Sequence, residues 1–172
     1  MSYLNPQAIV STEWLSRNIN DPNLVVLDGT YHLPTANRNA SEEFPLKHIE
    51  GAIFFDIDDI ADADNVLPHM LPSDKVFSEK VGALGINNEK QVVVYDVYGM
   101  QSAARTWWMF RFFGHDNVAV LDGGLPKWIK EGNQISSSPV TPSPTTFVCD
   151  RQPLLVKNLN EIKSEKRNFI DW

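Results

Sequence analysis

The chain of 172 residues contains a single cysteine, Cys149, few basic residues and no long hydrophobic run. One cysteine excludes an intrachain disulfide and a metal site built from four cysteines. With 15 basic against 22 acidic residues, the net charge of -7 argues against binding to nucleic acid or to an anionic membrane surface. No apolar run is long enough to span a bilayer, so no membrane association is expected.

Targeting features are also missing from the first ten residues. They have neither the basic start and apolar run of a signal peptide nor the Arg-rich character of a transit peptide. We therefore expect a cytoplasmic protein, with an organellar location left open.

Metal and nucleotide signatures are equally scarce. The histidines lie far apart in the sequence, and the glycines that follow Asp28 and Asp122 lack the pattern of a dinucleotide-binding loop. We expect no metal and no cofactor. The four histidines are His32, His48, His69 and His115.

Three short apolar runs each end in aspartate, at residues 24–28, 92–96 and 118–122. Continuous runs rich in β-branched residues favour strands that are covered on both faces, as in a parallel sheet between two layers of helices. In such sheets ligands bind beyond the carboxyl ends of the strands. The residues that follow each run are therefore the first place to look for chemistry.

Helical patterns alternate with these runs. Ser11 can cap a helix that ends at Asn18, and Ser73 can cap a second helix that stops at Gly85. A third helix is predicted over residues 102–113, and a fourth from Pro126 to Gly132. This alternation predicts an α/β fold with a central parallel sheet flanked by helices.

From residue 136 the composition changes to a stretch rich in Pro, Ser and Thr, which is typical of an extended linker. We predict one domain over residues 1–135, a linker over 136–157 and the start of a second domain over 158–172. A short strand is expected around Phe147 and a helix from Leu159 to Lys166. Residues 169–172 repeat the apolar-then-Asp pattern of Leu27 and Asp28. A new unit is therefore expected to begin where the chain stops, as in a truncated protein.

An ordered set of short motifs resembles the two-domain rhodanese and 3-mercaptopyruvate sulfurtransferase family. Each fragment alone has low specificity, but all of them occur in the family's order. The motifs are HIEGA and FFDID, then PHMLP and GALGI, then SAAR with WWMFR, FGH and LDGG, which occupy residues 48–52, 54–58, 68–72, 82–86, 102–105, 107–111, 113–115 and 121–124.

The resemblance implies a rhodanese-like fold of three layers and an amino-terminal, non-catalytic domain. In that family the reactive cysteine lies only in the second domain. The parent enzyme would carry sulfur from 3-mercaptopyruvate to a thiol or cyanide acceptor through a cysteine persulfide. Its partners would be the small sulfur donor, the thiol acceptor, and a second domain or dimer partner. The alternatives are a thiosulfate-specific rhodanese fragment and a stand-alone, inactive rhodanese module that binds other proteins.

Asp96 stands where the resemblance implies that a catalytic domain would have its cysteine. It opens a vestigial loop that contains Gly99 and leads into the helix at Ser102. An aspartate cannot store sulfane sulfur, and its charge would repel an anionic donor, so we expect this loop to be inactive. Arg105 is expected to face the loop or to form a structural salt bridge with Asp96.

His69 and Asp58 match two residues that have been viewed in mercaptopyruvate sulfurtransferases as a relay that activates the cysteine. A carboxylate can orient an imidazole that moves protons near a thiol. The alternative is that His69 is a loop residue bonded to the backbone and Asp58 a turn residue. We expect Arg38 to have a surface or interdomain role and Cys149 to be a structural thiol.

Overall fold

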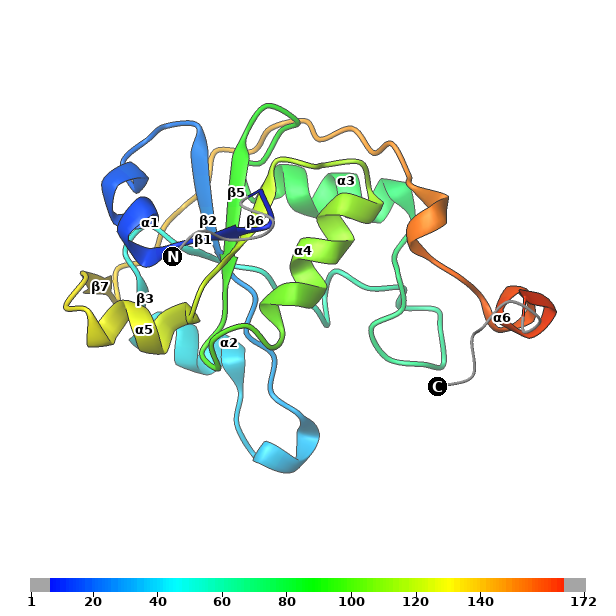
Figure 1. The fold of residues 1–172 in the computed structure, drawn as a ribbon, viewed down its shortest axis with the longest axis horizontal. Coiled ribbons are helices and arrows are strands. Elements are labelled where there is room, and N and C mark those ends of the chain that lie inside the picture. Colours follow the sequence, from blue (N-terminus) through cyan, green and yellow to red (C-terminus); the bar gives the residue numbers. More distant parts are fainter. Residues whose placement is uncertain (1–6, 166–172) are drawn as a thin grey trace.

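A five-stranded sheet of entirely parallel strands forms the centre of the computed structural model, which describes residues 7–165 (Figure 1). The strand order is β1-β6-β5-β2-β4. The strands are β1 (Ile9–Val10), β2 (Leu24–Asp28), β4 (Ile53–Phe54), β5 (Gln91–Tyr95) and β6 (Val118–Leu121). The three longest of them are the three apolar runs of the sequence, so the predicted parallel sheet is confirmed.

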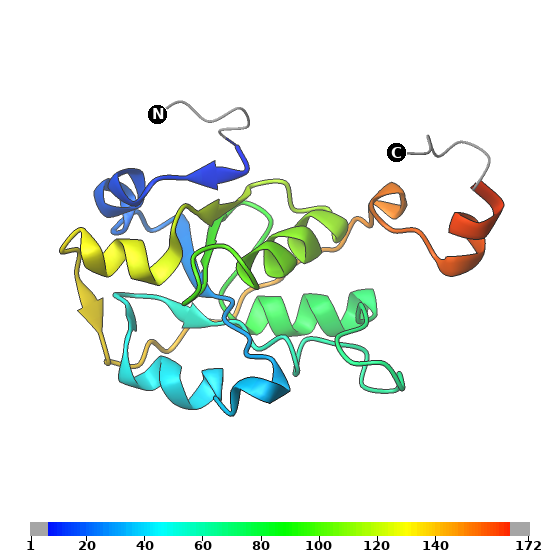
Figure 2. The ribbon, with the colours of Figure 1, turned by 60° about the horizontal axis from the view of Figure 1, so that its bottom comes forward.

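Helices cover both faces of this sheet (Figures 1 and 2). The core cluster on one face includes side chains of α3 and α4, and the cluster on the other face includes side chains of α1 and α5. The α/β fold with a flanked central sheet is therefore confirmed. The helices are α1 (Thr12–Asn18), α2 (Ala40–Glu43), α3 (Asp74–Ala83), α4 (Ala103–Phe112), α5 (Gly124–Lys130) and α6 (Leu159–Glu165).

Local sequence signals set the helix starts. The Ser11 hydroxyl accepts a hydrogen bond from Trp14 N at 3.1 Å, and the Ser73 hydroxyl accepts one from Val76 N at 3.3 Å. Each bond satisfies one of the free N–H groups of a first turn. Gly85 has φ +76° just beyond α3, a conformation that suits glycine, so the predicted stop is confirmed.

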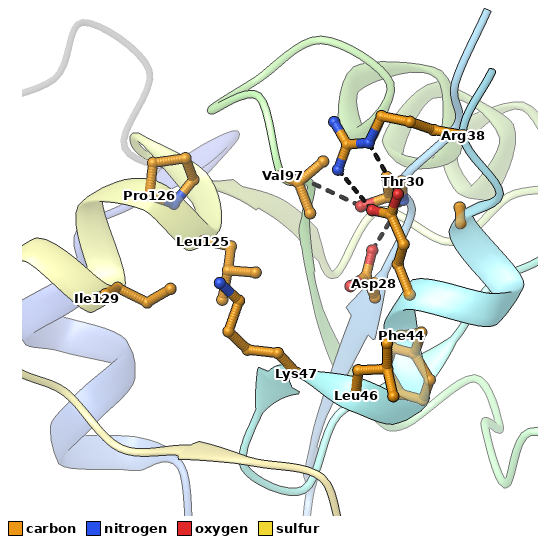
Figure 3. Close-up of a pocket in the computed structure, with 12 residues that line it drawn as sticks. Asp28, Thr30, Arg38, Phe44, Leu46, Lys47, Val97, Leu125, Pro126 and Ile129 are labelled. Atoms are coloured by element: carbon orange, nitrogen blue, oxygen red, sulfur yellow. Dashed lines mark hydrogen bonds and ion pairs between the residues drawn. The ribbon is translucent and has the colours of Figure 1, made fainter. Parts of the chain in front are cut away.

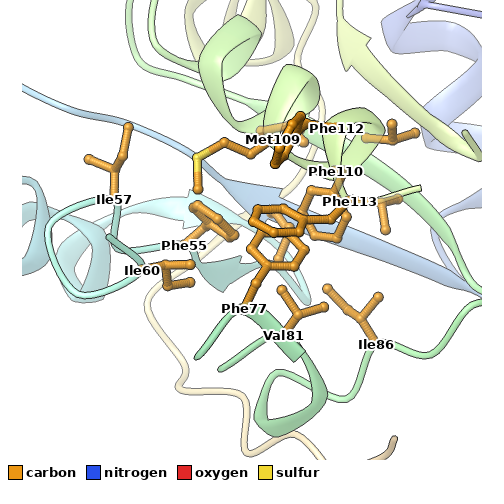
Figure 4. Packing of buried hydrophobic residues seen from close by; sticks show 14 of the residues in the cluster. Phe55, Ile57, Ile60, Phe77, Val81, Ile86, Met109, Phe110, Phe112 and Phe113 are labelled. Atoms are coloured by element: carbon orange, nitrogen blue, oxygen red, sulfur yellow. The ribbon is translucent and has the colours of Figure 1, made fainter. Parts of the chain in front are cut away.

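The core under α3 and α4 is rich in stacked aromatic rings (Figure 4). Phe77 lies parallel to Phe113 with ring centroids 3.9 Å apart, and Phe110 meets Phe77 edge-on at 5.5 Å. All three side chains are fully buried. Burial of each such ring contributes about 2–3 kcal/mol, so this cluster anchors both helices to the sheet.

Two further strands, β3 (His48–Ile49) and β7 (Ile135–Ser136), form a small antiparallel pair. After β7 the chain has no helix or strand until residue 153, so the strand expected around Phe147 is absent. Residues 145–152 nevertheless pack on the domain. Thr145 N donates to Gly82 O at 2.8 Å, and the Phe147 ring is buried against Phe77.

The chain then runs through a short 3-10 helix (Pro153–Leu155) to α6, which lies away from the sheet and its helices in both views (Figures 1 and 2). The predicted helix over residues 159–166 is thus present. The pattern noted at residues 169–172 lies outside the described residues.

His115 gives this core a dependence on pH. Its side chain is buried beside Phe110 and Phe147, its Nε2 has no hydrogen-bond partner among the described residues, and burial lowers its pKa. The unfolded chain, with a histidine pKa of about 6.5, therefore takes up the proton first as the pH falls. The stability contributed by neutral His115 is complete above pH about 6.5 and is lost as the pH drops below that value.

We expect the wild type to lose up to about 1.4 kcal/mol of unfolding free energy per pH unit below that value, relative to His115→Leu. Urea unfolding of both proteins at pH 7.5, 6.0 and 5.0 measures the difference, because the titration of all other groups cancels between them. Parallel pH profiles for the two proteins would contradict the prediction.

Candidate functional site

Asp96 directly follows β5 and is completely buried, with its carboxylate turned back into its own loop. Its Oδ1 accepts hydrogen bonds from three backbone N–H groups and its Oδ2 from two more. The donors are Tyr98 at 2.8 Å, Gly99 at 2.7 Å and Met100 at 3.2 Å, then Gln101 at 2.6 Å and Ala103 at 2.8 Å. A loop of convergent N–H groups at a helix start is an anion-binding cradle, and here the protein's own side chain fills it.

The rest of the loop is fixed from two sides. Leu125 N donates to Asp96 O at 2.9 Å, and a Cβ at Gly124 would lie 2.3 Å from the same oxygen, so the start of α5 approaches the loop closely. Gly99 has φ +104°, a backbone conformation that favours glycine. Ser102 does not cap α4, because its hydroxyl accepts a hydrogen bond from Tyr31 N at 3.1 Å.

Of the two alternatives for Arg105, the pairing with Asp96 is wrong, whereas its side chain does line a hollow together with Gln101 and Ser102 at the end of the loop. Arg105 Nη2 donates to the carbonyl oxygen of His69 at 2.6 Å, and its guanidinium lies 4.5 Å from the ring centroid of Trp108. The five backbone N–H groups already satisfy the Asp96 carboxylate, so no salt bridge forms there. Partial burial lowers the pKa of Arg105, but the group stays charged.

His69 and Asp58 lie in contact, as the family resemblance implied. His69 Nε2 is 2.6 Å from Asp58 Oδ1. The imidazole is 22% exposed and meets the ring of Tyr31 edge-on at 4.6 Å, whereas the Asp58 side chain is 69% exposed. His69 has φ +56°, which is uncommon for a residue other than glycine, and Arg105 binds its carbonyl group. The contact is formed, and its role in catalysis stays a prediction.

A hollow of about 260 Å³ connects His69 to the far end of the vestigial loop, and Asp58 lies outside its lining. It brings His69, Ser102 and Arg105 to one surface, while Asp96 stays beneath it. Tyr31, Leu33, Ile57 and Gln101 complete its lining.

A second polar network was not predicted. His32 Nδ1 lies 2.6 Å from the Tyr98 hydroxyl, and its Nε2 lies 3.2 Å from Glu43 Oε2. Arg38 grips the same carboxylate with two bonds, Nε to Oε1 at 2.8 Å and Nη2 to Oε2 at 2.5 Å. Arg38 thereby lowers the pKa of Glu43. The network connects α2 to the vestigial loop through residues distant in sequence, and no local sequence motif predicts it.

The surroundings of Cys149 stabilise its protonated thiol form and disfavour the thiolate. Its Sγ is 3.1 Å from the Ser78 hydroxyl and donates to Asp74 O at 3.5 Å. Burial raises the pKa of the thiol, the opposite of what a nucleophilic cysteine needs. This environment fits the structural thiol that the sequence predicted.

Within residues 7–165, no group of three or more His, Cys, Asp or Glu side chains is placed to hold a metal ion. None of the helices in this range is long and apolar enough to cross a membrane.

Comparison with known proteins gives a consistent match. Residues 11–131 match the model of the Rhodanese-like domain. The chain is 42% identical over 179 residues to Thiosulfate/3-mercaptopyruvate sulfurtransferase 1, mitochondrial, of Arabidopsis thaliana, a match that covers 92% of this chain and 47% of the relative. It is 40% identical to the human 3-mercaptopyruvate sulfurtransferase, with 95% of this chain and 58% of the relative covered.

Among solved structures, SseA from Escherichia coli, described as a 3-mercaptopyruvate sulfotransferase, superposes with a TM-score of 0.87 and 33% identity. That match covers 93% of this chain and 62% of the other. The chain thus spans about half the length of the relatives that it matches.

Proposed function

This chain belongs to the rhodanese-like domain family, and on that premise we propose that it is the non-catalytic half of a sulfurtransferase of the 3-mercaptopyruvate type. The enzyme would move sulfur from 3-mercaptopyruvate to a thiol or cyanide through a persulfide on a cysteine of a second domain. Relatives named for thiosulfate are as similar as those named for mercaptopyruvate, at 40% identity. The choice of donor therefore depends on the site residues.

One observation carries the non-catalytic assignment: the Asp96 carboxylate accepts five backbone hydrogen bonds. A catalytic thiolate or a bound anionic donor would need those same N–H groups. With the cradle occupied from within, the loop has neither a nucleophile nor free donors. The raised pKa of the Cys149 thiol supports the same assignment.

The His69 and Asp58 pair supports the choice of 3-mercaptopyruvate. In the tautomer that donates Nε2–H to Asp58, at 2.6 Å, the other ring nitrogen of His69 can accept a proton from a group across the hollow. Tyr31 and Arg105 fix the position of the imidazole. We propose that this pair assists the activation of a cysteine that lies on the second domain.

Exposed apolar side chains support a covering second domain. Leu33 is 60% exposed at the hollow, and Met100 is 43% exposed on the vestigial loop. On α6, Leu159 and Ile162 are 64% and 41% exposed. In this proposal these apolar groups are covered by the second domain. In the same proposal, residues 1–135 form the first domain and 158–172 begin the second. Residues 136–157 link the two, and part of this linker, residues 145–152, packs on the first domain.

The proposed compartment is the cytoplasm. An organelle is the alternative, since one relative carries "mitochondrial" in its name. A lone, half-buried cysteine is compatible with either location, because both maintain thiols in the reduced state.

Sulfur transfer to cyanide tests the function. The reading frame beyond the codon of Trp172 is sequenced first, and the full gene product is assayed with 3-mercaptopyruvate and with thiosulfate. We expect His69→Asn and Asp58→Asn to lower kcat/KM for 3-mercaptopyruvate by about a hundredfold, the lower range for a positioned proton-transfer group. Thiosulfate turnover should fall much less. The chain of 172 residues alone should give no turnover.

Several outcomes would contradict the proposal. Turnover by the isolated chain would contradict the assignment of the Asp96 loop as inactive. Equal decreases of kcat/KM with 3-mercaptopyruvate and thiosulfate in the His69 and Asp58 variants would contradict the proposed role of this pair in cysteine activation. A stop codon after Trp172 would favour a stand-alone interaction module instead. Asp59→Asn is the matched control, because Asp59 pairs with Lys80 and does not contact His69.

A further inference from the structure

A concavity beyond the carboxyl ends of β2 and β5 is separate from the His69 hollow. It has a volume of about 450 Å³ and shares no lining residue with that hollow (Figure 3). Much of its lining is apolar, with side chains of Phe44, Leu46, Val97, Leu125 and Ile129 beside several polar and charged residues. This size and lining lie within the range of pockets that bind small molecules.

The position of this pocket follows from the topology of the sheet. From β2 the chain crosses to β4 on one side and then returns to β5 on the other, so the strand order reverses between β2 and β5. Asp28 ends β2 and Val97 follows β5, and both line the pocket. In parallel sheets such a reversal opens a crevice beyond the carboxyl ends of the strands, where ligands bind. The Asp96 carboxylate occupies the backbone N–H groups of the vestigial loop, so this pocket is the part of the crevice that is open to a ligand.

Two of the four charged residues that line the pocket neutralise each other. Glu43 is held by two bonds from Arg38 and by His32. Asp28 lies 2% exposed at the floor, accepts a hydrogen bond from Thr30 N at 2.9 Å, and has its pKa raised by burial, so its negative charge is disfavoured.

The remaining charged group is the ammonium of Lys47. The Lys47 side chain reaches into the pocket with its ammonium beside Leu125 (Figure 3). It forms no ion pair with any residue of the described part of the chain. An open, largely apolar concavity with an exposed, unpaired ammonium at Lys47 matches a ligand that combines a hydrocarbon body with a single negative charge.

We propose that this pocket binds a small carboxylate with an apolar body, its carboxylate on Lys47 and its hydrocarbon against Leu125 and Ile129. The proposal is independent of sulfur transfer, because the pocket contains neither His69 nor Asp58. The site gives the non-catalytic domain a binding activity of its own.

Titration of the isotope-labelled chain with octanoate, followed by amide NMR, tests the site. We expect saturable shifts at Val97, Leu125 and Ile129, and no saturable shifts there with octylamine. Lys47→Glu should weaken octanoate binding by about tenfold or more, as loss of a charged hydrogen bond does. Ile129→Ser should weaken it through lost apolar contact and leave the preference for the anion unchanged.

Lys75→Glu provides the matched control, because it makes the same charge change on an exposed lysine of α3 outside the pocket. Its octanoate affinity should equal that of the wild type. The proposal is overturned if octanoate shifts residues elsewhere or none, if octylamine binds equally well, or if Lys47→Glu and Lys75→Glu behave alike while retaining the native spectrum.

Discussion

Replacing Asp96 by alanine should lower the free energy of unfolding by about 4 kcal/mol, because several buried N–H donors lose their acceptor at once. The five donors belong to one short loop and converge on the two oxygens of one carboxylate. Water can satisfy some of them, which keeps the loss below the sum of five separate bonds. Chemical denaturation of the variant and the wild type measures the effect.

An added anion should partly restore the Asp96→Ala variant. The emptied cradle has the geometry of a backbone anion site, so phosphate or sulfate can take the place of the lost carboxylate. Because these salts also stabilise folded proteins in general, the relevant quantity is the gain of the variant beyond that of the wild type in the same salt. No excess gain would contradict the view that Asp96 occupies an anion cradle.

Asp96→Asn separates charge from shape. An asparagine side chain has nearly the same size, but it has one oxygen acceptor where the carboxylate has two. Its NH₂ group would therefore face backbone N–H donors, and these donors would lose their acceptor. We expect a loss close to that of alanine and no rescue by anions, because the side chain still fills the space. Asp116→Asn is the control, since Asp116 is 80% exposed and its change should cost less than about 0.5 kcal/mol.

Local patterns were sufficient to predict the main elements of the fold. Continuous apolar runs produced β2, β5 and β6, and Ser11 and Ser73 cap α1 and α3 as expected. These features depend on residues close in sequence. The strands β1, β3, β4 and β7 have two residues each and were missed, because their pairing is decided by the tertiary fold rather than by a run of β-branched residues.

The sequence predicted which residues lie at the site better than it predicted the contacts that they make. The juxtaposition of His69 and Asp58 followed from the family resemblance and is present. Asp96 was placed correctly in its loop, and its repulsion of an anionic donor stays a prediction; the five hydrogen bonds that its carboxylate accepts from backbone N–H groups were not anticipated. For Arg105, only the alternative of a salt bridge with Asp96 was wrong, because its actual partner is the backbone carbonyl group of His69, and a sequence pattern does not reveal backbone partners. The contact between His32 and Tyr98 joins residues that no local pattern relates.

Phe147→Ala should reduce the free energy of unfolding by about 3–5 kcal/mol, although the sequence places Phe147 in a linker. Its ring is 3% exposed and meets Phe77 at 5.7 Å and His115 at 5.7 Å between ring centroids. Removing it leaves a cavity under α3 and α4. Urea unfolding, with Val148→Ala as the control at a 62% exposed neighbour, measures the difference.

The result bears on where the first domain ends. If Phe147→Ala lowers the free energy of unfolding strongly and Val148→Ala leaves it unchanged, residues up to at least 147 belong to the cooperative folding unit. The hydrogen bond from Asp150 N to Phe113 O, at 3.0 Å, also holds this segment on the domain. A loss below about 1 kcal/mol, typical of surface changes, would instead support a domain that folds within residues 1–135. The first outcome follows from the packing, because an extended segment can contribute to a core without forming a helix or strand.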